Sequence, residues 1–423
     1  MPTEFVPLVA LVATILLIVL LRPLAVRSGL VDIPNDRKSH RAPTPLVGGL
    51  AIYGGTALGF LLSTGGSVPL SSGEAYSFFG AGLLLVVVGV VDDFLDLPPA
   101  VKFVAQSLAA LVMIFGAGVV LTDLGSLTIR GDLLQLGILT VPFTAFATLG
   151  IINALNMCDG LDGLSGSLAL TSLSGLILVA SMWGRPTDLD LLLLLGAAVI
   201  GFLLFNRRIL GRESASIFMG DAGSMFLGLA LAWFTISLSQ GETRALHPSA
   251  ALWFVMVPIF DAVTLMLRRI RKGRSPFAAD REHLHDIFLR AGFTVNETVG
   301  MIVGLASLGV FVGLASIHFQ IPEWVVSGAF LLLGIGYFWI INHAWKAMRF
   351  LGHAICRRRG RPERRQGSTY NYTGPERRSG EDRRAQRSAL AESERASHRP
   401  SESPSPVGKP DPVGHPSIKS PLT

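Results

Sequence analysis

Eleven long apolar runs set the main constraint on what this chain can fold into. Each is close to the roughly 17–25 residues that an α-helix needs to cross the hydrocarbon core of a bilayer. Backbone polar groups need internal partners in lipid, so runs of this kind favour helices, and their lack of polar/apolar alternation excludes a β-barrel. The runs cover about residues 5–21, 46–64, 77–91, 102–121, 135–155, 164–183, 189–205, 223–239, 250–267, 298–317 and 323–343.

The composition agrees with a membrane protein. Only 16% of the 423 residues are charged, against roughly 25% in an average soluble chain. The first apolar run has no basic region before it and no cleavage site after it, so we expect a retained first span and not a signal peptide. We therefore predict an all-α polytopic membrane protein with about eleven transmembrane helices, whose transmembrane domain covers residues 1–349.

Basic residues in the loops predict which side of the membrane each loop faces. The loops after the first, third, seventh and ninth runs together hold 16 Lys and Arg residues, whereas the opposite loops hold three. Cytoplasmic loops carry the excess of positive charge in membrane proteins. The N-terminus is therefore expected outside and the C-terminus in the cytoplasm.

The tail, residues 350–423, differs in composition from the rest of the chain. From residue 344 onward there are 17 basic and 8 acidic residues, so the net charge there is +9 within a total of +6. The segment is rich in Ser and Pro and almost lacks large apolar side chains, so it cannot offset the entropy of ordering. We predict a disordered cytoplasmic tail, solvated and attracted to anionic lipid, with a specific partner site as the alternative.

Three carboxylates stand where the third apolar run ends. Asp92 and Asp93 are adjacent, and Asp96 would share a helix face with Asp92. Carboxylates this close repel one another unless a cation answers them, and Lys102 follows within ten residues. A solvated helix end is the simpler alternative.

Two further acidic stretches fall on the same predicted cytoplasmic face. One carries Asn156, Asp159 and Asp162 among glycines, and the other presents Asp221 between Gly220 and Gly223. Glycines beside oxygen ligands indicate a hard divalent cation, most plausibly Mg²⁺. Each Asp alone would also suit an ordinary helix N-cap.

The loop after the ninth run supplies the opposite charge. Arg281, His283 and His285 lie among seven basic residues. The two histidines are two residues apart, so on one helix they would face different ways, which favours anion binding over a zinc site. Acids, a divalent cation and a basic loop at one membrane face indicate phosphoryl chemistry on a lipid.

One charge lies inside an apolar run. Asp261 is costly in lipid and is a functional candidate by default. Arg268 and Arg269 follow about two helical turns later. We expect a structural ion pair or a hydrogen bond between helices in preference to catalysis.

The motifs together resemble one enzyme family. They read "DIPNDRKSHRAPTPLVGGLAIY", "VDDFLD", "NALNMCDGLDGL", "FMGDAGS" and "SPFAADREHLHDIFLRAGF". In this order they are similar to the polyprenyl-phosphate N-acetylhexosamine-1-phosphate transferases, from about residue 30 to residue 349. The resemblance implies that undecaprenyl phosphate attacks a UDP-N-acetyl-sugar, most plausibly UDP-GlcNAc, and that UMP leaves. It also implies a requirement for Mg²⁺, with Mn²⁺ as an alternative.

The resemblance assigns roles to the acidic motifs. Asp92 and Asp93 would be catalytic and handle the lipid phosphate. Asp221 would be the main metal ligand and Asn156 the second. Lys102 matches a lysine that contacts phosphate.

The resemblance also implies a substrate site. Asp159 and Asp162 would position the nucleotide, and Phe218 would stack on uracil. The basic loop would read the sugar and diphosphate through Arg281, His283 and His285. Two departures, Ser216 and Asp286, leave the sugar and its polysaccharide pathway open.

The expected location is the inner membrane of a bacterium, with the active site at the cytoplasmic face. No nucleic-acid partner is expected, and a homodimer stays open. A cation- or proton-coupled transporter is the alternative. Transporters bind near the bilayer midplane between repeated halves, whereas these acids gather at one face.

Overall fold

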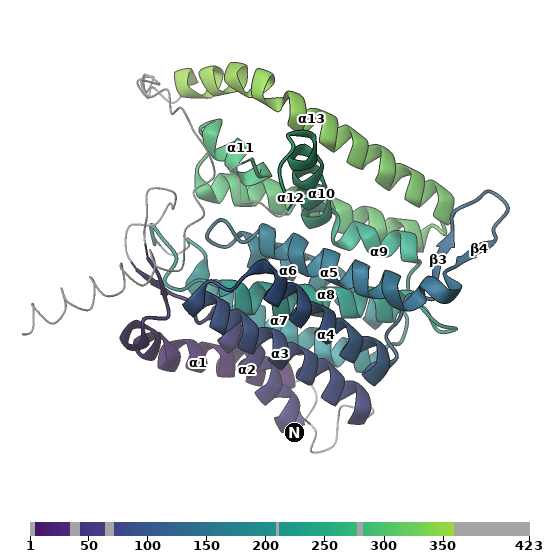
Figure 1. The fold of residues 1–423 in the computed structure, drawn as a ribbon, viewed down its shortest axis with the longest axis horizontal. Coiled ribbons are helices and arrows are strands. Elements are labelled where there is room, and N and C mark those ends of the chain that lie inside the picture. The colour runs from purple at the N-terminus through teal and green to yellow at the C-terminus, as the bar shows by residue number, and fades with distance from the viewer. Residues whose placement is uncertain (1–4, 34–42, 64–71, 209–210, 277–281, 359–423) are drawn as a thin grey trace, which may run out of the picture. The chain divides into compact units, whose positions relative to one another are not determined.

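The computed structural model describes residues 5–33, 43–63, 72–208, 211–276 and 282–358 (Figure 1). Within these ranges nine helices are long and apolar enough to cross a membrane, which confirms the predicted all-α polytopic class. They are α1 (Val6–Ser28), α3 (Ser72–Leu95), α4 (Pro99–Ala117), α5 (Thr140–Met157), α6 (Leu164–Met182), α7 (Pro186–Asn206), α8 (Gly220–Ser239), α12 (Val295–His318) and α13 (Glu323–Arg358).

Two of the eleven predicted segments take other forms. The segment at 46–64 becomes α2 (Gly48–Ser63), which is apolar but shorter than the spanning helices. The segment at 250–267 is broken into α9 (Pro248–Phe254) and α10 (Met256–Arg271), which meet at 83°. Counted as one broken span, this pair makes ten.

Pro258 explains the break between α9 and α10. Proline has no backbone N–H, so residue 258 cannot donate the helical hydrogen bond to the carbonyl of Phe254, four residues earlier. The hydroxyl of Ser172 on α6 donates to that carbonyl instead, at 2.6 Å. The regular pattern resumes one residue later, where Ile259 N donates to Val255 O at 3.2 Å. A neighbouring helix thus satisfies the carbonyl that the proline leaves without its usual donor.

The short elements lie at the ends of the helices. Strand β1 (Val31–Asp32) pairs antiparallel with β2 (Thr44–Pro45), and β3 (Asp123–Ser126) pairs antiparallel with β4 (Leu133–Gln135), which precedes the 3₁₀ turn η2 (Gly137–Leu139). Figure 1 places the β3–β4 hairpin at one end of the helices and α11 (Leu284–Arg290) at the other.

The last helix, α13, extends into the region that was predicted to be the tail. Helix α13 continues to Arg358, past the predicted boundary between residues 349 and 350. Residues 359–423, which include most of the predicted disordered tail, lie outside the described residues.

Helix α8 is the central helix of the bundle. In its most apolar 18-residue stretch 94% of the residues are buried, and α2, α3, α5 and α6 pack around it. Glycines allow the backbones to approach closely, as is common where membrane helices meet. A Cβ on Gly228 would lie 2.6 Å from the Cα of Ile152 on α5, and a Cβ on Gly89 of α3 would meet the backbone of Ala222.

These close approaches fix the ends of three helices relative to one another. Gly89 lies four residues before Asp93, and Ala222 follows Asp221 directly. Ile152 lies four residues before Asn156. Tight packing one turn away therefore brings the polar ends of α3, α5 and α8 to one place.

Gly89→Ala should destabilise the protein because the added methyl group would clash with the α8 backbone. Unlike a side chain, the backbone cannot avoid the clash by changing its rotamer. Overpacking of this kind costs about 1–3 kcal/mol. We expect a lower midpoint of thermal unfolding for the purified protein in detergent. Gly80→Ala is the matched control, since it lies on the same helix and a Cβ there meets nothing within 4 Å. Equal midpoints for the two variants would contradict the proposed packing.

Candidate active site

Lys102 on α4 joins carboxylates from two other helices. Its Nζ donates to Oδ2 of Asp92 on α3 at 2.9 Å and to Oδ2 of Asp221 on α8 at 3.2 Å. Asp92 is 4% exposed, so this pairing takes place largely away from water. The structure thus provides the cationic neighbour that the acidic cluster was expected to need.

The turn between α3 and α4 sets this geometry. The backbone N–H of Leu97 donates to Oδ1 of Asp92 at 2.7 Å, which closes the turn. Asp96 lies beyond the last residue of α3 and has a φ of 56°. The expectation that Asp96 shares a helix face with Asp92 is therefore wrong, because the helix ends first and Asp96 adopts the left-handed conformation that Asp tolerates.

The first turn of α8 brings three predicted residues together. Oδ1 of Asp221 accepts a hydrogen bond from Nδ2 of Asn156 at 3.0 Å, and the same amide donates to Oγ of Ser224 at 2.8 Å. The backbone N–H of Asp221 donates to Oδ1 of Asp93 at 3.2 Å. Asp93 thus lies at the N-terminal end of a helix, where the helix dipole favours negative charge.

Gly220 is the residue that this arrangement requires. Its φ is 70°, in the left-handed region that glycine adopts at little cost. A Cβ at this position would also collide with the carboxylate of Asp93. The glycine before Asp221 therefore lets α3 and α8 bring their carboxylates side by side.

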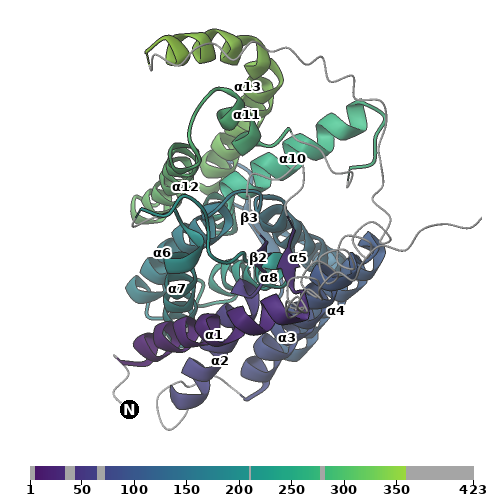
Figure 2. The ribbon, with the colours of Figure 1, turned by 90° about the vertical axis from the view of Figure 1, so that its left-hand side faces the viewer.

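The predicted uracil-stacking residue, Phe218, is held by its backbone. Its N–H donates to Pro45 O at 2.8 Å, and its carbonyl accepts from Gly48 N at 3.0 Å. Hydrogen bonds to the end of β2 and the start of α2 therefore hold the backbone just before α8 in place. Figure 2 looks onto this end of the helices, where β2 and α8 lie close together.

The two aspartates of the loop between α5 and α6 have different surroundings. Asp162 is 6% exposed, and its Oδ2 accepts from Nε of Arg208 at 2.7 Å and from Ala215 N at 3.0 Å. These partners tie the loop to the segment between α7 and α8. Nucleotide contact by Asp162 stays a prediction.

Asp159 lies on the same loop, and the residue as a whole is exposed. Desolvation of its carboxyl, followed by repulsion from Asp221, raises the pKa of Asp159 to about 7. Asp221 therefore influences the charge state of the Asp159 carboxyl.

His283, at the end of the loop between α10 and α11, and His285, in the first turn of α11, lie against this loop. His283 and His285 stack with ring centroids 5.2 Å apart. A Cβ on Gly160 would lie 2.7 Å from Cε1 of His285, so the imidazole rests on the backbone beside Asp159. Burial, and also the neighbouring His283, lowers the pKa of His285. Arg281 lies outside the described residues.

The expectation that the two histidines face different ways is wrong. It assumed that both lie on one helix, but His283 is the extended N-cap residue and α11 begins at Leu284. The change of backbone conformation between them lets the rings stack.

Asp261 has a partner that the sequence did not indicate. Its Oδ2 lies 3.0 Å from Nδ1 of His283, and its Oδ1 accepts from Leu284 N at 3.0 Å and from the hydroxyl of Tyr337 at 3.2 Å. The prediction of a structural interaction in place of catalysis is consistent with these contacts. The expected arginine partners bind elsewhere, Arg268 to Glu282 and Arg269 to the carbonyl of Pro276.

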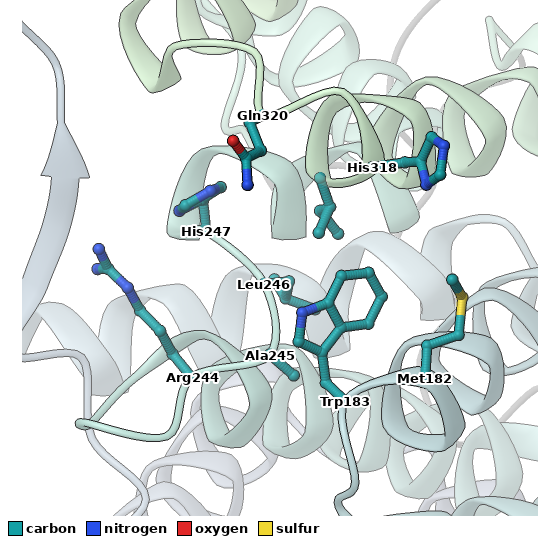
Figure 3. A pocket seen from close by; sticks show the side chains of 9 residues that line it. Met182, Trp183, Arg244, Ala245, Leu246, His247, His318 and Gln320 are labelled. Carbon is teal, nitrogen blue, oxygen red and sulfur yellow. The ribbon is translucent and has the colours of Figure 1, made fainter.

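One cavity in the described part of the chain lies away from this cluster. Its volume is about 340 Å³, and it lies at the C-terminal ends of α6 and α12, whereas the acidic cluster adjoins the N-terminal ends of α6 and α8. Trp183, His247 and Gln320 line it, as Figure 3 shows. It contains none of the predicted site residues.

The sequence matches a known family over the part of the chain that forms the acidic cluster. The chain matches the family model described as glycosyl transferase family 4 over residues 75–239, which include Asp92, Lys102, Asn156 and Asp221. An undecaprenyl-phosphate α-N-acetylglucosaminyl 1-phosphate transferase of Escherichia coli K12 is 35% identical over 361 residues, which are 85% of this chain and 95% of that protein.

Two other relatives carry the same name. The Salmonella typhimurium protein is 37% identical over 358 residues, which are 84% of this chain and 95% of that protein. The Haemophilus influenzae protein is 32% identical over 344 residues, which are 81% of this chain and 95% of that protein. With this identity over nearly the whole of each relative, the chain belongs to the polyprenyl-phosphate N-acetylhexosamine-1-phosphate transferase family.

Proposed function

We propose that this protein transfers N-acetylglucosamine 1-phosphate from UDP-GlcNAc to undecaprenyl phosphate and releases UMP. A phosphate oxygen of the lipid forms a bond to the sugar-bearing β-phosphorus, and the bond from that phosphorus to the bridging oxygen breaks. The product, undecaprenyl-diphospho-GlcNAc, begins a cell-envelope polysaccharide. The observation that carries this proposal is the meeting of Asp92, Asp93, Lys102, Asn156 and Asp221 at one end of the helices.

The charge of the cluster suits a phosphorylated substrate and a divalent cation together. Asp92, Asp93 and Asp221 bring three carboxylates, and Lys102 brings one ammonium group. Within the described part of the chain, no three His, Cys, Asp or Glu side chains are arranged to hold a metal ion by themselves. This fits Mg²⁺, which proteins commonly bind through one or two carboxylates plus the phosphate oxygens of a substrate.

Asp221 and the amide oxygen of Asn156 are the hard oxygen donors that would hold Mg²⁺, as the family resemblance implies. Bound there, the ion supplies positive charge to the diphosphate oxygens. Lys102 supplies further positive charge beside Asp92, where the lipid phosphate would bind. A phosphate monoester has a second pKa near 6 and is mostly dianionic at neutral pH, so positioning by Asp93 matters more than removal of a proton.

The two loops that meet at Gly160 and His285 would bind the sugar nucleotide. Asp159 lies beside this contact, and Phe218 lies close before Asp221 in the chain, where an aromatic ring can stack on uracil. The chain between His283 and His285 would face the diphosphate and sugar. The name shared by the relatives supports GlcNAc as the sugar.

The site would face the cytoplasm of a bacterium, where UDP-sugars are made. The basic loops that predict this sidedness lie at the same end as the cluster, since Arg208 binds Asp162 and Arg268 binds Glu282 next to His283. The N-terminus of α1 would then lie outside the inner membrane.

Purified protein in detergent should release UMP from UDP-GlcNAc when undecaprenyl phosphate and Mg²⁺ are both present. Detergent removes the compartments that a transporter needs, so UMP release separates the two functions. The assay should include a panel of other UDP-N-acetyl-sugars, because Ser216 and Asp286 leave the sugar open. No UMP release with any of them would refute the proposed transfer.

Asp221→Asn should lower the rate of UMP release at least 100-fold, because it removes the charge of the proposed main metal ligand. The Mg²⁺ concentration needed for half-maximal rate should rise in any residual activity. Asp132→Asn makes the same chemical change in the exposed loop between β3 and β4 and should leave both quantities unchanged. An unaltered Mg²⁺ response in Asp221→Asn would count against the metal assignment.

Asp162→Asn and Asp159→Asn should separate stability from nucleotide binding. The first breaks a partly buried ion pair and should lower the free energy of unfolding by about 1–3 kcal/mol, which a thermal shift in detergent would measure. The second should raise the KM for UDP-GlcNAc with little change in the unfolding midpoint. The reverse pattern would exchange the two roles.

A further inference from the structure

We infer that Asp261 and Tyr337 are positioning residues that hold His283 in place for the sugar nucleotide. This inference rests on the proposed function. It concerns two residues on α10 and α13 that carry none of the roles assigned above. Three polar groups converge on one carboxylate that is 3% exposed, two of them from the adjacent residues His283 and Leu284 and one from Tyr337 on α13.

The contacts form a path from α13 to the loop that carries Asp159. The hydroxyl of Tyr337 donates to Oδ1 of Asp261, and Oδ2 of Asp261 lies 3.0 Å from Nδ1 of His283. His283 stacks on His285, which rests on Gly160. The loop that contains Gly160 also carries Asp159 and follows Asn156 at the end of α5.

The carboxylate fixes both the ring and the backbone of the loop. Because an Asp carboxylate accepts hydrogen bonds, it favours the proton on Nδ1 of His283 and so determines where Nε2 points. The other oxygen accepts from the N–H of Leu284, the first residue of α11. The same side chain therefore orients His283 and anchors the start of the helix that carries His285.

Burial makes these contacts persistent. Asp261 lies within α10, where water does not compete for its oxygens, and a buried carboxylate without partners is costly. The ring of Tyr337 also packs against Phe260, at a centroid distance of 5.8 Å. Movement of α13 relative to α10 would therefore change the position of His283.

Tyr337→Phe is the mildest test, since it removes one hydroxyl and keeps the ring. We expect kcat/KM for UDP-GlcNAc to fall about three- to tenfold, the effect of one lost hydrogen bond. The change should appear mainly in the KM for UDP-GlcNAc, with the KM for undecaprenyl phosphate unaltered. Tyr53→Phe is the matched control, because it removes a hydroxyl that donates to Phe79 O at 2.9 Å elsewhere in the bundle.

A double-mutant cycle tests whether the effect passes through His283. On a His283→Gln background, Tyr337→Phe and Asp261→Asn should each change kcat/KM less than about twofold, because their target is already gone. On the wild-type background, Asp261→Asn should cost at least as much as Tyr337→Phe. Unfolding midpoints of all variants identify any that fail to fold, and Tyr337→Phe keeps the test valid if Asp261→Asn does.

Four outcomes would overturn the inference. These are equal losses on both backgrounds, equal rises in the KM of both substrates, a loss for Tyr53→Phe equal to that for Tyr337→Phe, and full activity in Tyr337→Phe. Failure of the proposed function is a separate result, since the wild-type protein would then release no UMP.

Discussion

The geometry of the site depends on how closely the backbones around α8 approach one another. Gly89 lies against Ala222 and Gly228 against Ile152, so α3 and α5 are held to α8 without intervening side chains. Asp93 and Asn156 lie one turn beyond these contacts, and Asp221 directly precedes Ala222. Residues more than a hundred positions apart in sequence thus meet because of small residues that have no chemistry of their own.

The close packing of these helices brings several carboxylates together, and their negative charge needs compensation. A cluster of carboxylates at the end of a helix bundle is unstable unless positive charge answers it. Lys102 supplies part of that charge, and the N-terminus of α8 supplies a partial charge to Asp93 through a backbone N–H. The remaining negative charge supports our proposal of a divalent cation that carries a phosphorylated substrate.

Much of the fold could be predicted from sequence because the relevant signals are local. Apolar length located the spanning helices, and stretches of glycine and aspartate marked the helix ends that form the cluster. Helix ends and contacts between distant parts of the chain were harder to predict from the sequence. The stacking of His283 on His285 depends on a helix that begins between them, and the displacement of Asp96 depends on where α3 ends. The partners of Asp261 come from 22 and 76 residues further along the chain, and nothing in the local pattern distinguishes Tyr337 from other aromatic residues of α13.

The hydrogen bond from Ser172 to Phe254 has a consequence for how this chain can vary. Pro258 creates a carbonyl that lacks its donor, and Ser172 on another helix supplies one. The two residues are therefore a linked pair. A chain that lost the proline could regain a continuous helix and would no longer need the hydroxyl, whereas a chain that lost only the hydroxyl would leave a bare carbonyl in an apolar interior. Substitution at these two positions is expected to be ordered in time, with proline replaced before serine.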